Sequence, residues 1–409
     1  MRVGEVPDVA EQRGVPVSTG AEAGLDGAFL DVAARTRLRC WLITGTGRVV
    51  AGAGELPRSS ALLLAAAWAG AGTGGVAETA HGRFTLLPVA GESAAGAAVA
   101  GWFLACAGRP GEWTPGQARA VAELAADAVH VRARSAARRG GERGLAEALI
   151  GRLASSGDGT GGVGTRALLH AAGLRPGYLA LALRVGGQAA GRDRAADRDR
   201  DRAADRELAE DLVSGYAGAT GRSAVAIAGD EVLAVITGMD AAGLAAWLRE
   251  AGPVLKAAGL ALSAGIGGPA ASADALAGAV REASGVRRAA VMRAAAAAGK
   301  AAASVCVATS AEVDSHELLL ASVPTPVLRS FRERLLGPLV DYDARHNAEL
   351  LSTLRSFLAC DGSWSACASR MYVHVNTVRY RIGRIEALTG RDLSALPDRV
   401  DFFLALRGA

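Results

Sequence analysis

The sequence predicts a multidomain protein in which two mixed α/β domains are followed by an all-α domain. Its 409 residues, half of them apolar, are enough for two to four domains with sizeable cores. Segments with the two-residue period of strands alternate with helical segments up to about residue 310. Beyond that point the periodic segments are helical, so residues 311–409 are predicted to form a separate helical domain.

Composition limits the classes of protein that fit. A formal net charge of +4 is too small over this length to indicate an acidic partner for the whole chain, so electrostatic arguments must be local. Five cysteines without a CxxC pair indicate core thiols in a reducing cytosol rather than disulfides or a zinc site. Residues 1–24 predict a disordered tail and carry no secretory signal. With no apolar run of spanning length, we expect a cytoplasmic protein without a membrane partner.

The first α/β domain is expected over residues 25–140. Its periodic segments predict strands at 40–43, 49–51, 83–89 and 98–107, and a helix at 60–69. Thr114-Pro-Gly-Gln117 is a capping box with proline at the first helical position, and it opens a long closing helix. The apolar stripe of that helix is Val121, Leu124, Ala128 and Val131.

The closing helix ends in a basic stretch before Gly140-Gly141, and a separate helix is expected at residues 145–153. This stretch is either a signalling helix that pairs two protomers or the solvated end of a linker, and the sequence leaves both interpretations open.

The strand-turn-strand start and the long closing helix resemble a GAF-like sensor domain. The resemblance implies an effector pocket between the sheet and its helices, with mostly apolar walls. Aromatic residues make up only 4% of the chain, and those between residues 41 and 103 are candidate lining residues, although ordinary core packing is the commoner explanation for each. The candidates are Trp41, Trp68, Phe84, Trp102 and Phe103.

The second α/β domain is expected over residues 141–310, with a charge-balanced insertion at 192–206 that predicts a solvated helix or loop. Strands are predicted at 178–185, 223–228, 232–237 and 260–266, and helices at 207–219, 241–258 and 273–298. Residues 304–320 are expected to be linker and return structure. This order of elements resembles the GGDEF-like domain found in the middle of CdaR-type regulators.

A nucleotide-cyclase signature would fall at Ala228-Gly229-Asp230-Glu231, which raises the question of catalysis. A cyclase needs paired glycines close to its substrate and carboxylates that hold magnesium on the phosphates. Ala228 replaces the first glycine, and the strand at 178–185 ends without an aspartate. We therefore interpret Asp230 and Glu231 as turn residues of a hairpin and expect no catalytic residue, cofactor or metal. The GxSxG, HExxH and P-loop motifs are also missing.

The most informative pattern lies at Ser363–Gly390 and predicts a helix-turn-helix. Val378, Ile382 and Ile385 repeat at i, i+4 and i+7 and form the buried side of the second helix. Helices at 329–335 and 347–359 are expected to pack behind this unit. A last helix, starting near Pro397-Asp398, is expected to bury Val400, Phe403 and Leu404.

The other side of the second helix is the face that a DNA major groove would meet. Residues 363–391 contain five arginines and one glutamate, so positive charge gathers where phosphates would approach. Arginine can read guanine, and an asparagine at a helix start can read adenine, bind phosphate or act as a cap. A solvated basic face with Asn376 as a cap is the alternative. The candidate DNA-binding residues are His374, Asn376, Thr377, Arg379, Tyr380, Arg381 and Arg384.

The run from His374 to Arg381, HVNTVRYR, resembles the C-terminal helix-turn-helix of the PucR/CdaR family of bacterial transcription regulators. The segments 336–343 and 350–354 resemble the lead-in to that domain. Met371 and Cys367 depart from the usual aliphatic and small residues, away from the outward face. The resemblance implies a transcription regulator with a sensor domain, a non-catalytic middle domain and a C-terminal DNA reader.

We therefore expect a regulator that binds double-stranded DNA and responds to a signal, for which a small-molecule effector is the partner suggested by the GAF-like resemblance. Because one helix-turn-helix makes few contacts, we expect a homodimer or higher even oligomer. The helix at residues 115–139 is the best candidate for self-association. The alternative is a cyclic-dinucleotide signalling enzyme whose C-terminal domain docks another protein.

Overall fold

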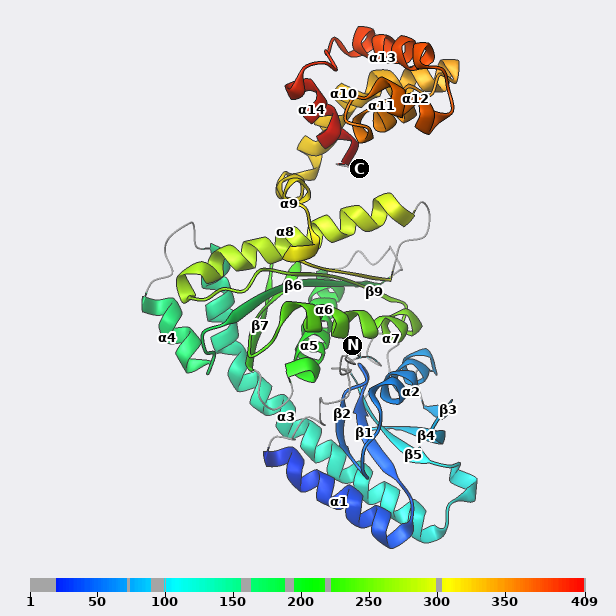
Figure 1. The fold of residues 1–409 in the computed structure, drawn as a ribbon. Helices are drawn as coiled ribbons and strands as arrows, with labels where there is room; N and C mark the ends of the chain where they lie inside the picture. Colours follow the sequence, from blue (N-terminus) through cyan, green and yellow to red (C-terminus); the bar gives the residue numbers. More distant parts are fainter. Residues whose placement is uncertain are drawn as a thin grey trace, which may run out of the picture. The chain divides into compact units, whose positions relative to one another are not determined.

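The structure, a computed structural model, describes residues 20–71, 74–89, 99, 101–155, 163–187, 195–217, 222–298 and 304–407 (Figure 1). The chain divides into two compact units, residues 1–287 with 303–310 and residues 288–302 with 311–409. Among the described residues, no helix is long and apolar enough to cross a membrane. Residues 1–19 of the expected tail lie outside the described part, whereas helix α1 (Gly20–Thr36) begins within the stretch expected to be disordered.

An antiparallel five-stranded sheet occupies the first part of the larger unit, with the strand order β2-β1-β5-β4-β3. Its strands are β1 (Cys40–Thr44), β2 (Val49–Gly52), β3 (Gly75–Thr79), β4 (Gly82–Pro88) and β5 (Trp102–Ala107). Four of them coincide with predicted strands. β3 is an addition, because this mostly exposed edge strand shows no apolar alternation. Cys40 lies opposite Cys106, and the Cys40 thiol together with burial raises the pKa of the Cys106 thiol.

Helices cover both faces of this sheet. α1 and the first part of α3 (Pro115–Ser155) pack on one face, and α2 (Arg58–Ala71) packs on the other. The predicted capping box at the start of α3 is confirmed: the backbone N–H of Gln117 donates to Thr114 Oγ1 at 3.2 Å, and the N–H of Thr114 donates to Gln117 Oε1 at 2.8 Å. The predicted stripe from Val121 to Val131 is buried.

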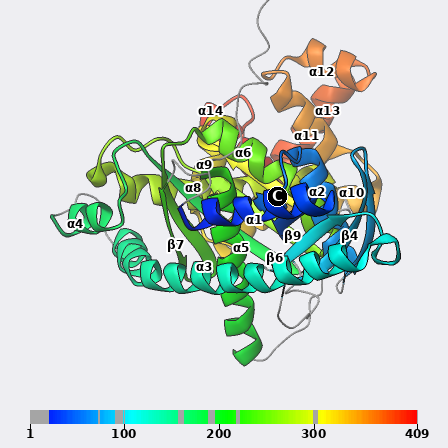
Figure 2. The same ribbon diagram turned by 90° about the horizontal axis from the view of Figure 1, so that it is seen from below.

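The expected break at Gly140-Gly141 is wrong, because α3 is one continuous helix of 41 residues that includes both glycines. Figures 1 and 2 show it as one rod that passes both sheets of the larger unit. Its second buried stripe, beginning at Ala146 and ending at Leu153, packs against the second sheet. Packing at both ends supplies the stability that the glycines lack on propensity alone.

The second sheet has the order β10-β9-β6-β8-β7, in which β10 runs parallel to β9 and the other pairs are antiparallel. Its strands are β6 (Tyr178–Gly187), β7 (Arg222–Ala228), β8 (Glu231–Thr237), β9 (Leu260–Ile266) and β10 (Val305–Thr309). Its helices are α4 (Val163–Ala171), α5 (Ala195–Ala217), α6 (Ala241–Glu250), α7 (Gly252–Ala257) and α8 (Ala273–Ala298). α5 includes most of the charged insertion.

Two expectations for this part need correction. The single helix expected at 241–258 is divided into α6 and α7, because Pro253 takes a first-turn position of the second helix. β10 forms a strand in the stretch expected only as linker and return structure, where partly buried positions conceal the strand pattern.

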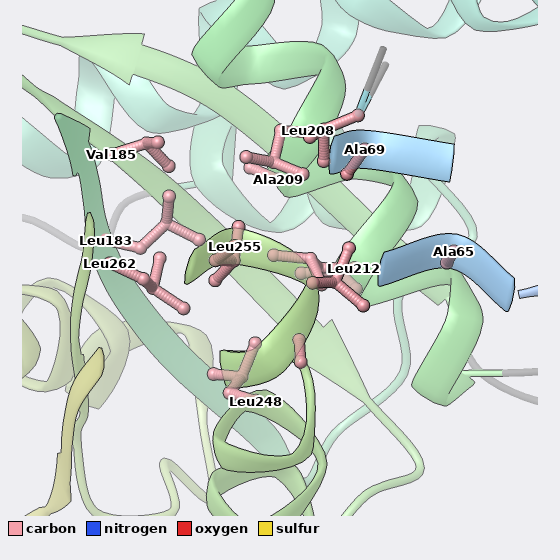
Figure 3. Packing of buried hydrophobic residues seen from close by; sticks show 14 of the residues in the cluster. Ala65, Ala69, Leu183, Val185, Leu208, Ala209, Leu212, Leu248, Leu255 and Leu262 are labelled. Atoms are coloured by element: carbon pink, nitrogen blue, oxygen red, sulfur yellow. The ribbon is translucent and has the colours of Figure 1, made fainter. Parts of the chain in front are cut away.

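The two sheets share one hydrophobic cluster. Figure 3 shows Ala65 and Ala69 of α2 beside Leu208 and Leu212 of α5, with residues of β6, α6, α7 and β9 to the left of and below them. Polar contacts border the cluster. Arg48 Nη2 lies 3.0 Å from Asp211 Oδ1.

A second polar contact at this border involves Arg58, whose Nε lies 2.5 Å from Glu250 Oε2 while its guanidinium lies over the Trp247 ring. Burial lowers the pKa of Arg58, and Glu250 acts in the opposite direction. The two α/β segments therefore form one packed body.

Glu231 is not the simple turn residue that the sequence suggested. Its side chain is only 11% exposed, accepts hydrogen bonds from Ser284 Oγ at 2.6 Å and Arg287 Nε at 2.8 Å, and thereby ties β8 to α8. Asp230, one residue earlier, does behave as an exposed turn residue and pairs with Arg184 at 2.9 Å.

The smaller unit is helical and has its own core. Its helices are α9 (Ser315–Ser322), α10 (Thr325–His346), α11 (Leu350–Ala359), α12 (Trp364–Met371), α13 (Val375–Thr389) and α14 (Leu396–Arg407). α10 is much longer than the predicted 329–335. The predicted inward side of α14 is wrong for Val400, which is exposed; Phe402 and Ala405 are the fully buried residues.

Candidate nucleic-acid interface

Helices α12 and α13 form a helix-turn-helix whose turn is fixed by its end residues. Ser363 caps α12, accepting the backbone N–H of Ala366 at 3.3 Å. Tyr372 ends the helix with a left-handed φ of 57°. His374 then caps α13, because its Nδ1 accepts the N–H of Asn376 at 3.2 Å. Asn376 is therefore not the cap, and its side chain is exposed.

The predicted buried side of α13 is confirmed: Val378, Ile382 and Ile385 are all but inaccessible to solvent. They share a core with Cys367 and Ala368 of α12. Burial raises the pKa of the Cys367 thiol, which keeps it a neutral core group. This packing fixes which side of α13 faces outward.

Most candidate DNA-binding residues lie on that outward side. His374, Asn376, Arg379, Tyr380 and Arg384 are exposed, and Tyr380 is 72% exposed. Thr377 is half-buried on a flank. Gly383 is also exposed, and a Cβ added there would meet nothing within 4 Å. The backbone of α13 is therefore not covered by a side chain at this point.

Arg381 is the exception among the candidates. It follows Val378 by three positions, so it lies beside the buried stripe and turns toward α11. Its Nη1 lies 2.9 Å from Glu349 and 3.3 Å from Thr353 Oγ1. Arg391, counted in the positive charge of this segment, likewise pairs with Asp398 at 2.6 Å. Both arginines brace the domain instead of facing outward.

Two outward arginines are supported by aromatic rings. The guanidinium carbon of Arg379 lies 5.9 Å from the Trp364 ring centroid, and that of Arg384 lies 4.8 Å from the Tyr342 ring centroid. Such contacts hold a long side chain in place while its N–H groups stay available. The acid of this helix, Glu386, accepts the backbone N–H of Leu393 at 2.9 Å and is half-buried.

The structure adds Tyr372 to this surface, since its side chain is 96% exposed in the turn before α13. Arg370 of α12 is exposed as well. The sequence signal for Tyr372 was its position between the two helices, where an aromatic residue has no core to enter.

The five aromatic residues proposed for an effector pocket are all buried, but they do not share one side of the sheet. Trp41 and Phe84 pack edge to face at 5.7 Å, and Trp68 of α2 stacks on Phe103 at 5.1 Å, so these four residues lie in the core between α2 and the sheet. Trp102 belongs to the opposite core, because adjacent residues of β5 point to opposite faces.

A family model matches the C-terminal segment of the chain. Residues 350–408 match the family described as the PucR C-terminal helix-turn-helix domain. A protein from Thermomonospora curvata, encoded in the pkwA 5′ region, is 43% identical over 82 residues, which are 20% of this chain and 45% of that protein.

Two named regulators are similar over shorter shares. The transcriptional activator PmfR of Paenarthrobacter nicotinovorans is 36% identical over 75 residues, 18% of this chain and 16% of its own. The DNA-binding transcriptional activator AdeR of Bacillus subtilis is 28% identical over 72 residues, 18% of this chain and 17% of its own. The chain thus matches less than half the length of these relatives.

A solved structure, the regulator of polyketide synthase expression from Bifidobacterium adolescentis, shares 17% identity with a TM-score of 0.28, covering 65% of this chain and 97% of that one.

The family match and the geometry of α12 and α13 describe the same segment. Residues 350–408 therefore belong to the PucR C-terminal helix-turn-helix domain family.

Proposed function

We propose that the chain is a DNA-binding transcriptional regulator that inserts α13 into the major groove and couples operator binding to a signal received by its α/β unit. The observation that carries this proposal is the outward side of α13, where Asn376, Arg379, Tyr380 and Arg384 are exposed and the acid of the helix is turned away. The named relatives PmfR and AdeR are transcriptional activators.

The chemistry of each residue suits a part of the task. Arginine binds O6 and N7 of guanine on two atoms, and asparagine binds N6 and N7 of adenine, so Arg379, Arg384 and Asn376 are proposed to read bases. The positive end of the α13 helix dipole, together with His374 and Thr377, suits a phosphate. Tyr380 offers an apolar ring and a hydroxyl to the groove.

Fluorescence anisotropy with labelled DNA from the region upstream of the gene tests this proposal. Arg379→Ala and Arg384→Ala are each expected to weaken binding by ~1–3 kcal/mol if the arginine reads a base. If the arginine contacts a phosphate instead, the slope of log affinity against log salt concentration is expected to fall by about one. Arg329→Ala, an exposed arginine of α10 outside α12 and α13, is the matched control. Unchanged affinity in both α13 variants would remove the helix from the groove.

The signal is proposed to enter through the α/β unit, as GAF-like and GGDEF-like segments would allow, with a small-molecule effector bound near the aromatic residues between α2 and the first sheet. A ligand there acts on DNA binding only through different affinities for two arrangements of the protein. We expect such an effector to quench tryptophan fluorescence and to shift DNA affinity at the same concentrations.

The regulator is proposed to act in the cytoplasm as a homodimer or higher even oligomer, which pairs two half-sites. Light scattering of the full-length protein gives the mass directly. A monomer that retains tight operator binding would contradict this part of the proposal.

A cyclic-dinucleotide enzyme is the less favoured function, because the two carboxylates of the relevant turn already have arginine partners, Arg184 for Asp230 and Arg287 for Glu231. Incubation with GTP and Mg²⁺ separates the two functions. Turnover would favour the enzyme.

A further inference from the structure

A cavity of about 470 Å³ lies within the C-terminal unit, away from α13. Five helices line it: the end of α8, α9, α11, α12 and α14. Its apolar wall consists of Ala289, Met292, Leu320, Leu358, Phe403 and Leu406. The volume is within the usual range for small-molecule sites.

Contacts within the unit hold these walls in place. Arg288 Nε donates to the carbonyl of Ala321 at 2.6 Å, which joins the end of α8 to α9. The His316 ring of α9 lies 5.0 Å from the Phe403 ring of α14. The apolar wall therefore has a defined shape before anything binds.

The rim of the cavity is positively charged. Arg293 is already satisfied, since its Nη2 lies 3.0 Å from Glu317 Oε2 and 2.9 Å from the carbonyl of Glu312. The three other arginines, Arg355, Arg370 and Arg407, are exposed and have no acidic partner in the part of the chain that the structure describes. They come from three different helices and border one opening.

We propose that this cavity binds an amphipathic organic anion, a carboxylate or sulfonate carried on an apolar body. The body packs on Met292, Leu358 and Phe403, and the acid group binds among the three arginines. Apolar walls favour burial of hydrocarbon, and guanidinium groups bind oxyanions on two atoms. An inorganic anion would leave the apolar wall in water, and a neutral hydrocarbon would leave the arginines without a partner. The proposal does not depend on DNA binding.

Titration of the full-length protein with 8-anilinonaphthalene-1-sulfonate, followed by fluorescence and calorimetry, tests the site. We expect a saturable site from which dodecanoate displaces the probe while dodecyltrimethylammonium does not. The double variant Arg355→Ala/Arg407→Ala is expected to weaken probe binding roughly tenfold or more, because two charge-assisted contacts are lost. Arg329→Ala, on α10 and outside the cavity, is expected to leave it unchanged.

Ala359→Trp is a second variant that fills the cavity without removing charge, and it is expected to abolish the same binding event. Circular dichroism checks that each variant is folded; the arginine pair is exposed, so its loss should leave the core intact.

Equal displacement by the cationic and anionic detergents would overturn the proposal. Unchanged probe affinity in the arginine double variant would also overturn it. If the same variant showed a flatter salt dependence of DNA binding, the arginines would be assigned to DNA phosphates instead.

Discussion

Replacement of Glu231 by alanine should strongly destabilise the α/β unit. The carboxylate accepts hydrogen bonds from Ser284 and from two nitrogens of Arg287, and Arg287 Nη1 also donates to Ser263 Oγ at 3.2 Å. The two charged side chains are only 11% and 9% exposed. Removing one partner of such a buried pair leaves the other charge uncompensated, which costs about 3–5 kcal/mol.

Asp230→Ala is the matched control, because Asp230 is the adjacent residue and also forms an ion pair. That pair is 68% and 55% exposed, so its loss should cost about 0–1 kcal/mol. Urea denaturation followed by tryptophan fluorescence measures both variants, since five of the six tryptophans lie between residues 41 and 247. If Glu231→Ala falls within 1 kcal/mol of Asp230→Ala, the reasoning from burial is refuted.

Three further predictions concern the backbone and the pH dependence of stability. Gly140→Ala with Gly141→Ala should raise the free energy of unfolding by about 1–2 kcal/mol in thermal melts, because both glycines are exposed in α3 and a Cβ there would meet nothing. Gly265→Ala should do the opposite, as its Cβ would lie 2.2 Å from a backbone nitrogen of α8; a neutral result would contradict that close approach. Two hydrogen bonds lower the pKa of Asp398 from its ordinary value of 3.8: the larger effect comes from the backbone N–H of Asp392 and the smaller from the Arg391 side chain. The ionised carboxylate therefore stabilises the fold above its ordinary pKa, and this contribution is lost as the pH falls through the lowered pKa. The melting temperature of Asp398→Asn should therefore lie below that of the parent at pH 7 and converge with it in acid, and a constant gap would count against this role.

The sequence predicted local structure best where one period governs a segment. Val378, Ile382 and Ile385 define the inward side of α13 by themselves, and most of the outward residues follow from them. Arg381 was misplaced because it borders the stripe, and its direction depends on Glu349, which lies 32 positions earlier, just before α11. No period within α13 carries that information.

Errors elsewhere have the same origin in distant contacts. Gly140 and Gly141 favour a break locally, yet packing on both sides of them keeps α3 continuous. The role of Glu231 depends on Arg287, which the sheet and α8 bring to it across 56 positions. A single sequence shows the hairpin turn at Asp230 but not which turn residue will be covered by a helix.

The continuity of α3 limits how the two sheets can move relative to each other. Val131 packs on the first sheet and Ala146 on the second, roughly 22 Å further along the helix axis. A hydrogen-bonded helix keeps its length, so the spacing between these two anchor points is fixed unless a turn melts. The exposed glycines between them resist bending less than other residues would. A disturbance at the first sheet would therefore reach the second as a tilt or a twist of a rod of constant length.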